Sequence, residues 1–351
     1  MLFATDDWFA VAENMLKDTD PISNDKYTDC GKWMDGWETR RKRIPGHDWC
    51  IIKIGAPCVI RGVLVDTAFF TGNFAPRVSV QGTVLSDIDL QGSPTRRSKI
   101  GTACNNEELR KIDKLNSDHW DEVVEMTTMK AGYEETRKNY IYVNSNEVYT
   151  HLRINMYPDG GIARFHVFGD IVTNIDDIPS DVTIDLISMQ NGGACVEYSN
   201  AHYGHPRNLI KPGRGLFMGD GWETGRRLDR PAILEADDNG ILKVPGCEWA
   251  TMKMCCIGAI SEIIVDTNHF KGNFPDSVQI DGTFLHEDET LMSAEWVPVL
   301  ARRKLSAHRE HHYSNEIWNR GPFNYLRIIM APDGGISRVR IFGNKLDDYM
   351  E

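Results

Sequence analysis

The sequence lacks the features that mark several large classes of protein. Its 351 residues contain no apolar run near the roughly 18 residues that a membrane-spanning helix needs. A net charge of -12 argues against a nucleic-acid-binding surface, which would show a basic stripe. The basic run 40–43 is short, and only part of it returns later in the chain. We therefore expect neither a membrane nor a nucleic acid as a partner.

Sequence motifs of common enzyme classes are also missing. There is no G-x-S-x-G, no H-E-x-x-H, no phosphate-binding P-loop and no dinucleotide fingerprint. His308, His311 and His312 have a spacing that can bind metal, but no duplicated counterpart supports such a site, so a solvated charged loop is favoured. We expect no cofactor. A divalent cation that activates water stays open as an alternative, and its ligands are unknown.

The cysteines form no recognisable framework. None of the eight lies in a C-x-x-C motif, and there is no N-x-S/T glycosylation site. Residues 1–7 lack the basic start and apolar run of a signal peptide, and the C-terminus is not a peroxisomal address. We therefore expect reduced thiols and an intracellular, cytoplasmic location.

What the chain does contain is a long internal duplication. Asp-Gly-Trp-Glu-Thr at 35–39 returns at 220–224, and Pro-Asp-Gly-Gly-Ile at 158–162 returns at 332–336. From 65 to 83, ten of nineteen positions match at an offset of 200, and from 152 to 169, twelve of eighteen match at an offset of 174. Average composition would give about one match in either window. We infer two copies of one domain, at 1–172 and 182–351.

Short runs of branched and aromatic residues, bounded by Gly, Pro, Asn or Asp, predict β-strands throughout both copies. Examples are 49–54, 59–66, 77–81, 151–157 and 162–168. The Pro-Asp-Gly-Gly segment predicts a hairpin turn between two such runs. Strands at this spacing predict an all-β fold of tandem duplicated jelly-roll β-sandwich domains.

The two copies differ in their loops. The first difference lies between the threonine that ends the Asp-Gly-Trp-Glu-Thr motif and the Pro-Gly pair that follows it. This loop has 20 residues after Thr224 and 5 after Thr39, so the second copy is longer by 15 residues. Between Thr83 and Leu152 the first copy is longer by 26 (200 minus 174), and this extra piece predicts a short helix near 105–111. The copies thus present different loops around similar scaffolds.

The repeated polar residues are the candidates for function, because a duplicated core needs only apolar residues of suitable size. In the first motif, Glu38 and Glu223 are acceptors suited to N–H donors, and neighbouring arginines can bind a carboxylate in bidentate fashion. These arginines are Arg40, Arg41, Arg226 and Arg227. A structural role for Trp37 and Trp222, as core plugs beside a turn, remains open.

Further repeated residues lie at strand ends and within one strand. Asp66 and Asp266 each end a strand and precede Asn73 and Asn273 in a loop, where either ligand contacts or Asx turns are plausible. Arg153 and Arg327 lie in mid-strand, as buried ligand clamps or as surface residues.

These motifs together resemble the allantoicase (allantoate amidinohydrolase) family over nearly the whole length. The resemblance is carried by Phe-Ala-Thr-Asp-Asp at 3–7, the segment 31–41, Pro-Gly-His-Asp-Trp at 45–49, the segments 70–78 and 199–204, and both Pro-Asp-Gly-Gly turns. It implies two galactose-binding-like jelly rolls, hydrolysis of allantoate to ureidoglycolate and urea in purine (allantoin) degradation, and a homo-oligomer. A non-catalytic carbohydrate- or ligand-binding protein, or a member that has lost activity, are the alternatives.

The substrate implied by this resemblance suits the motifs. Allantoate carries one carboxylate and two ureido arms on one carbon, so an Arg would bind its carboxylate and acidic side chains its N–H groups. We expect general acid–base catalysis, with Glu38 and Glu223 as first candidates. The further candidate acids are Asp35, Asp66, Asp220 and Asp266, and His202 is a possible proton carrier. The sequence leaves open which copy holds the site.

Overall fold

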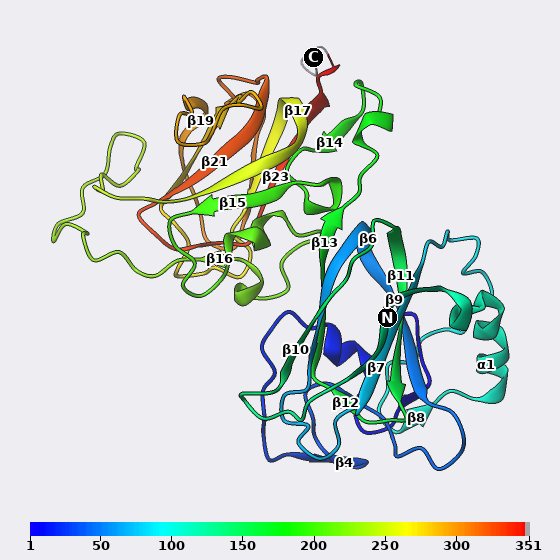
Figure 1. Ribbon diagram of the computed structural model, residues 1–351. Coiled ribbons are helices and arrows are strands. Elements are labelled where there is room, and N and C mark those ends of the chain that lie inside the picture. Colours follow the sequence, from blue (N-terminus) through cyan, green and yellow to red (C-terminus); the bar gives the residue numbers. More distant parts are fainter. Residues whose placement is uncertain (348–351) are drawn as a thin grey trace. The chain divides into compact units, whose positions relative to one another are not determined.

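The computed structural model describes residues 1–347, and the chain divides into two compact units, Met1–Val172 and Thr173–Glu351. Each unit is built almost entirely from antiparallel strands (Figure 1). This confirms the prediction of a duplicated all-β sandwich.

In the first unit a seven-stranded sheet is organised by one long strand, β6 (Asp48–Asp66). Its first half pairs with β1 (Phe3–Ala4) and β11 (Val148–Tyr157), and its second half with β10 (Lys138–Tyr142) and β13 (Arg164–Ile171). The long strand thus contributes to both layers of the sandwich. Strand β7 (Arg77–Thr83) pairs with β11, and β9 (Asp121–Thr128) pairs with β7. Three short ladders complete the unit: β2 (Asp6–Asp7) with β8 (Thr102–Ala103), β3 (Tyr27–Thr28) with β4 (Gly31–Lys32), and β5 (Trp37–Glu38) with β12 (Gly161–Ile162).

The second unit repeats this plan around β17 (Glu248–Asp266), which like β6 has 19 residues. Its first half pairs with β15 (Ala194–Tyr198) and β21 (Phe323–Ala331), and its second half with β20 (Glu310–Tyr313) and β23 (Arg338–Lys345). The remaining pairs are β14 (Thr183–Asp185) with β23, β18 (Ser277–Thr283) with β21 and with β19 (Val297–Lys304), and β16 (Trp222–Glu223) with β22 (Gly335–Ile336). Short 3₁₀ turns connect strands in both units, at Ala12–Leu16, Asp113–Leu115, Ser117–His119, Ile175–Asp177, Met189–Asn191, Pro206–Ile210 and Met218–Asp220.

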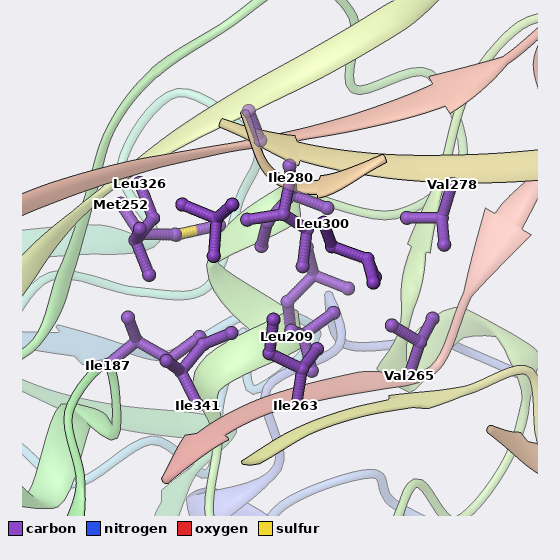
Figure 2. Close-up of a cluster of buried hydrophobic side chains, with 14 of the residues drawn as sticks. Ile187, Leu209, Met252, Ile263, Val265, Val278, Ile280, Leu300, Leu326 and Ile341 are labelled. Atoms are coloured by element: carbon purple, nitrogen blue, oxygen red, sulfur yellow. The ribbon is translucent and has the colours of Figure 1, made fainter. Parts of the chain in front are cut away.

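Each sandwich encloses its own apolar core. In the first unit Leu152, Ile154 and Met156 of β11 alternate along the strand and are fully buried in this core. In the second unit Met252, Ile263, Ile280, Leu326 and Ile341 meet between the layers (Figure 2). Burial of this kind, about 1.5–3 kcal/mol for each large aliphatic side chain, stabilises both sandwiches.

The extra segment of the first unit covers the outer face of its sheet. Its helix α1 (Asn106–Ile112) begins with a capping box formed by Asn105 and Glu108. Ile112 packs with Trp49 and Ile51 of β6. As a result Arg153, on that outer face, is only 7% exposed.

Candidate functional site

Three repeated segments meet at one end of each sandwich. In the first unit Glu38 of β5 pairs with Gly161 of β12, and Thr39 N donates to Gly160 O at 3.1 Å. The second unit repeats the arrangement, with Glu223 opposite Gly335 and Thr224 N donating to a glycine carbonyl at 3.0 Å. The Pro-Asp-Gly-Gly turn is therefore the strand partner of the Trp-Glu-Thr segment.

The turn needs glycine at its third position. Gly160 has φ +135° and Gly334 has φ +137°, a region that residues with a side chain rarely adopt. A Cβ on Gly160 would also lie 2.7 Å from backbone atoms of Phe74. The close approach of these two loops brings the asparagine of the Gly-Asn-Phe segment beside the glutamate.

The glutamate and the asparagine form a hydrogen-bonded pair in both units. Asn73 Nδ2 donates to Glu38 Oε1 at 2.6 Å, and Asn273 Nδ2 donates to Glu223 Oε1. Within residues 1–347 neither Oε2 accepts a hydrogen bond, so one carboxylate oxygen of each glutamate is available to a ligand. Burial raises the pKa of Glu38, and the hydrogen bond from Asn73 only partly opposes this shift.

An unpaired arginine follows each pair at the same spacing. Arg41 and Arg226 each lie two residues after the threonine, and both are exposed. Over the part of the chain that the structure describes, neither guanidinium has a hydrogen bond or an ion pair. Each cluster thus combines an acceptor with an arginine whose donors are free for a carboxylate.

In the second unit this cluster lines a cavity of about 430 Å³. Glu223, Arg226 and Asn273 all contribute to its wall. The other lining residues include Tyr203, Arg230, Leu242, Asp276, Lys304 and Asp333. Its volume lies within the range of about 300–1,000 Å³ that is typical of small-molecule sites.

Two of the cations around this cavity are already paired. Arg230 Nη2 lies 2.5 Å from Asp333 Oδ1, and Lys304 Nζ pairs with Asp276. Arg226 is therefore the cation with uncompensated charge at the wall. A ligand with one carboxylate would find its partner there.

Part of the wall of this cavity comes from residues that the first unit lacks. Arg230 and Leu242 belong to the longer loop of the second copy, 225–244. Lys304 of β19 pairs with Ser277 of β18. In the matching β7–β9 ladder of the first unit, Arg77 pairs with Thr128, so the residue in the place of Lys304 is a threonine. These wall residues are thus specific to the second copy, although the glutamate–asparagine pair is shared.

A second cavity of the same unit, of about 490 Å³, offers different chemistry. Its lining includes His286, Glu289 and Glu295 but neither arginine nor lysine among the described residues. Nothing there attracts an anion, and none of the repeated polar motifs reaches it.

Asp35 lies in a buried ion pair and Asp220 in a partly buried one. Asp35 lies 2.6 Å from the Arg164 guanidinium and 2.7 Å from Lys17 Nζ, and Asp220 lies 2.7 Å from Arg338. Burial raises the pKa of both carboxyls, but hydrogen bonds from their arginines outweigh it and bring each pKa below its usual value. These carboxylates hold the scaffold together, so we do not carry them further as proton donors.

Asp66 and Asp266 close the turns that follow the long strands. Asp66 accepts from Ala68 N at 2.8 Å and from Arg137 at 2.5 Å. Asp266 accepts from Asn268 N and from Arg214, each at 2.8 Å. Both are about 2% exposed. This is the Asx-turn arrangement that the sequence left open.

The two tryptophans face the cores. Trp37 and Trp222 are fully buried, and each indole N–H donates to a backbone carbonyl at 2.8 Å, of Asp6 and Asn200 respectively. His202 is exposed and packs edge-to-face on Tyr203, which lines the second-copy cavity, at 4.3 Å between ring centroids. His202 does not line the cavity, so its role as a proton carrier stays a prediction.

The remaining arginines of the sequence analysis are occupied by other partners. Arg40 pairs with Asp6 at 2.7 Å and lies over Trp8, and Arg227 pairs with Asp229 and Glu248. Arg153 stacks on Trp49 at 4.0 Å, and Arg327 lies between Trp249 and Trp296 at 4.5 and 4.2 Å. The strand arginines thus belong to the outer sheet face.

Sequence reasoning missed Arg230, Lys304 and Asp276, because they occur in one copy only. It also missed Asp48 and Glu248, which anchor Lys42 at 2.7 Å and Arg227 at 3.0 Å. Asp48 and Glu248 could have been found from the sequence. Each is an acidic residue directly before a tryptophan, and the two positions correspond at the offset of 200 between the copies.

Residues 1–347 lack two further features. No group of three or more His, Cys, Asp or Glu side chains in that range is arranged to hold a metal ion. In the same range no helix is long and apolar enough to span a membrane.

Comparison with known proteins identifies the family. The family model for the allantoicase repeat matches twice, at residues 1–172 and 184–346. A probable allantoicase from Acinetobacter baumannii (strain SDF) is 39% identical over 344 residues, which is 97% of this chain and 89% of that protein.

Solved structures agree with this match. A structure of allantoicase superposes with a TM-score of 0.71 at 32% identity, covering 98% of this chain and 89% of the other. The crystal structure of allantoicase from Saccharomyces cerevisiae gives 0.70 at 32% identity, covering 97% and 89%. The chain belongs to the allantoicase family, hydrolases of allantoin degradation.

Proposed function

We propose that this chain hydrolyses allantoate to ureidoglycolate and urea, and that the reaction takes place in the cavity of the second copy. One observation carries the proposal beyond family membership. A half-buried glutamate, oriented by an asparagine, shares a cavity of about 430 Å³ with an arginine that is unpaired within the described residues.

The cavity suits the shape and charge of allantoate. The planar guanidinium of Arg226 would bind the single carboxylate through two parallel hydrogen bonds. The side-chain oxygen of Asn273 would accept an N–H group from a ureido arm, and the free oxygen of Glu223 would face the nitrogen of that arm. Arg230 and Lys304, each paired with an acid, would keep the wall polar without a large excess of charge.

The chemistry needs a proton for the leaving group and a base for water. We propose that the carboxyl of Glu223 donates a proton to the ureido nitrogen as its bond to the central carbon breaks, which releases urea. The nitrogen of the other ureido arm supplies electrons to that carbon. Water then adds to the carbon and returns a proton to the Glu223 carboxylate, which gives ureidoglycolate.

The first copy contains the same pair in a different setting. Burial raises the pKa of Glu38, which is the direction that favours a general acid. The longer loop that walls the second-copy cavity is absent around it. We therefore propose that Glu38 makes the smaller contribution to turnover.

Urea release from allantoate by the purified full chain tests this proposal, with and without a chelator. We expect urea in stoichiometric amounts, with equal rates in both conditions, because we propose no metal. Activity lost with chelator and restored by a divalent cation would replace the metal-free mechanism. Allantoate binding without urea at any protein concentration would reject the enzyme and support a binding protein.

The proposal extends to the assembly and the compartment. We propose a homo-oligomer in the cytoplasm. All eight cysteines are free, which suits a reducing compartment. Light scattering on the purified chain would test the oligomer, since a mass of 39.8 kDa would indicate a monomer.

A further inference from the structure

Two adjacent cysteines lie at a bulge of the long strand of the second unit. The register of β17 against β21 shifts between Lys253 and Gly258, and this interval contains Cys255 and Cys256. Adjacent side chains of a regular strand point to opposite faces of a sheet. Here the two sulfur atoms are only 3.9 Å apart, so the bulge brings both thiols together.

The fold does not require sulfur at this place. The first unit has the same shift in β6, between Lys53 and Cys58, and the equivalent positions at an offset of 200 are Gly55 and Ala56. The duplicated scaffold therefore forms this bulge with a glycine and an alanine. The pair of thiols is an addition that only the second copy has.

The surroundings favour reaction at Cys256. Both residues are partly exposed. The Cys255 thiol donates a hydrogen bond toward the Cys256 sulfur, which lowers the pKa of Cys256. Burial and the acids Asp347 and Asp176 oppose this shift, and the ammonium group of Lys345, paired with Asp347 at 2.9 Å, adds to it. The same hydrogen bond and burial raise the pKa of Cys255.

Three other thiols of the chain lie in less reactive surroundings. Burial raises the pKa of Cys104 and of Cys195 to about 11, so both remain protonated near neutral pH. Cys50 is fully buried, and its pKa is raised further. These three provide internal references for the reactivity of the adjacent pair.

We propose that Cys255 and Cys256 form a redox modification site, in which a hydroperoxide converts the dithiol reversibly into a disulfide between adjacent residues. The Cys256 thiolate attacks a peroxide oxygen, which gives a sulfenic acid and hydroxide. The Cys255 thiol then attacks the Cys256 sulfur, an S–S bond forms, and the sulfenic oxygen leaves as water. The dithiol loses two electrons and two protons in total, and the peroxide is reduced.

The disulfide formed should be easy to reduce. Consecutive Cα atoms are about 3.8 Å apart across a trans peptide, whereas most disulfides join Cα atoms that are about 4.4–6.8 Å apart. The bond therefore forms under strain, and strained disulfides are the labile ones. Reversibility under mild dithiol treatment is part of the proposal.

Peptide mass mapping after graded hydrogen peroxide tests the proposal on the full chain. At the lowest effective dose we expect the number of thiols open to alkylation after denaturation to fall from eight to six. The loss of two hydrogens should map to the peptide that carries Cys255 and Cys256, and dithiothreitol should restore both thiols. The double variant Cys255→Gly/Cys256→Ala copies the first unit and should keep all six of its thiols at that dose.

Two results would overturn the proposal. One is first oxidation at Cys104, Cys195 or another cysteine while Cys255 and Cys256 remain reduced. The other is oxidation of Cys256 to sulfinic acid without any disulfide to Cys255. Because the readout is the thiol state of the wild-type chain, neither depends on allantoate turnover or on how a variant folds.

Discussion

The two copies of this domain share an acid–amide pair but differ in what surrounds it. Glu38 and Glu223 occupy the same ladder position and accept the same hydrogen bond from an asparagine. In the second copy this pair lies in a cavity whose wall includes Arg230 from a longer loop. The first copy extends a different segment, whose helix α1 covers the outer face of the sheet. Duplication kept the scaffold, and the loops changed what each copy offers to a ligand.

The largest expected effect of this difference is on turnover. Glu223→Gln keeps the hydrogen bond from Asn273 but removes the proton donor, so we expect kcat to fall about 10²- to 10⁴-fold. Glu38→Gln is the matched change in the first copy and should lower kcat far less. Urea release at saturating allantoate measures both, and a larger loss for Glu38→Gln would transfer the site to the first copy.

A second effect concerns stability. Asp35→Asn leaves Arg164, whose side chain is 1% exposed, without its charged partner, and should cost about 3–5 kcal/mol of unfolding free energy. Asp220→Asn should cost less, because the Asp220 side chain is 14% exposed and its contact to Lys211 is 3.4 Å long. Urea denaturation of both variants measures the two costs. Equal costs would mean that burial does not distinguish the two ion pairs.

The pH dependence of these two costs has a definite sign. The pKa of Asp35 and that of Asp220 are lower in the folded chain than the usual value of about 3.9. Their contribution to stability is therefore complete above about pH 4 and is lost as pH falls through the folded pKa. The difference between wild type and Asp35→Asn should shrink at low pH, and a constant difference would contradict the ionised pair.

A third, smaller effect is on substrate affinity. Arg226→Met removes the proposed carboxylate anchor, worth about 1.5–3 kcal/mol for a charged hydrogen bond, so KM should rise about 10- to 100-fold. Arg226→Lys keeps the positive charge and should recover part of this loss. The recovery should be incomplete, because an ammonium group lacks the bidentate geometry of a guanidinium group. Arg41→Met is the matched control. If Arg41→Met raised KM as much as Arg226→Met, the carboxylate would not be assigned to the second copy.

The smallest expected effect is a change in how strongly the stability of the protein depends on pH. Burial raises the pKa of Glu38, so the folded chain holds this proton more tightly than the unfolded chain does. Stability contributed by the neutral carboxyl is lost as pH rises from the unfolded pKa, near 4.3, through the folded one. The melting temperature of Glu38→Gln should therefore vary less with pH over that range than the melting temperature of the wild type. A melting temperature whose pH profile matches the wild type would contradict the raised pKa.

Much of the scaffold could be predicted from the sequence, because strand patterns and turns are local signals. The run 77–81 corresponds to β7, and the helix near 105–111 corresponds to α1 with Asn105 as its cap. The run 162–168 corresponds to β12 and β13 but is interrupted at Ala163, whose backbone N–H donates to Asp66 O instead. Such a break depends on a partner distant in the sequence.

The same reasoning explains which site residues could be predicted. Glu38 and Asn73 stood out because both are repeated. That they bond to each other follows from the turn at Gly160, a tertiary contact. The pairing of Asp35 with Arg164 joins residues 129 positions apart, so the sequence could not separate an ion pair from a free acid. Lys304 could not be predicted as a site residue in this way, because its counterpart in the first copy is Thr128 and the lysine is not repeated.

The most direct test of the account is a crystal structure of the Glu223→Gln variant soaked with allantoate. This variant keeps the cavity and should hold the substrate without cleaving it. We expect one allantoate per chain in the second copy, with its carboxylate on Arg226 and a ureido arm against residues 223 and 273. Allantoate bound beside Glu38, with the second-copy cavity unfilled at saturating substrate, would contradict the assignment.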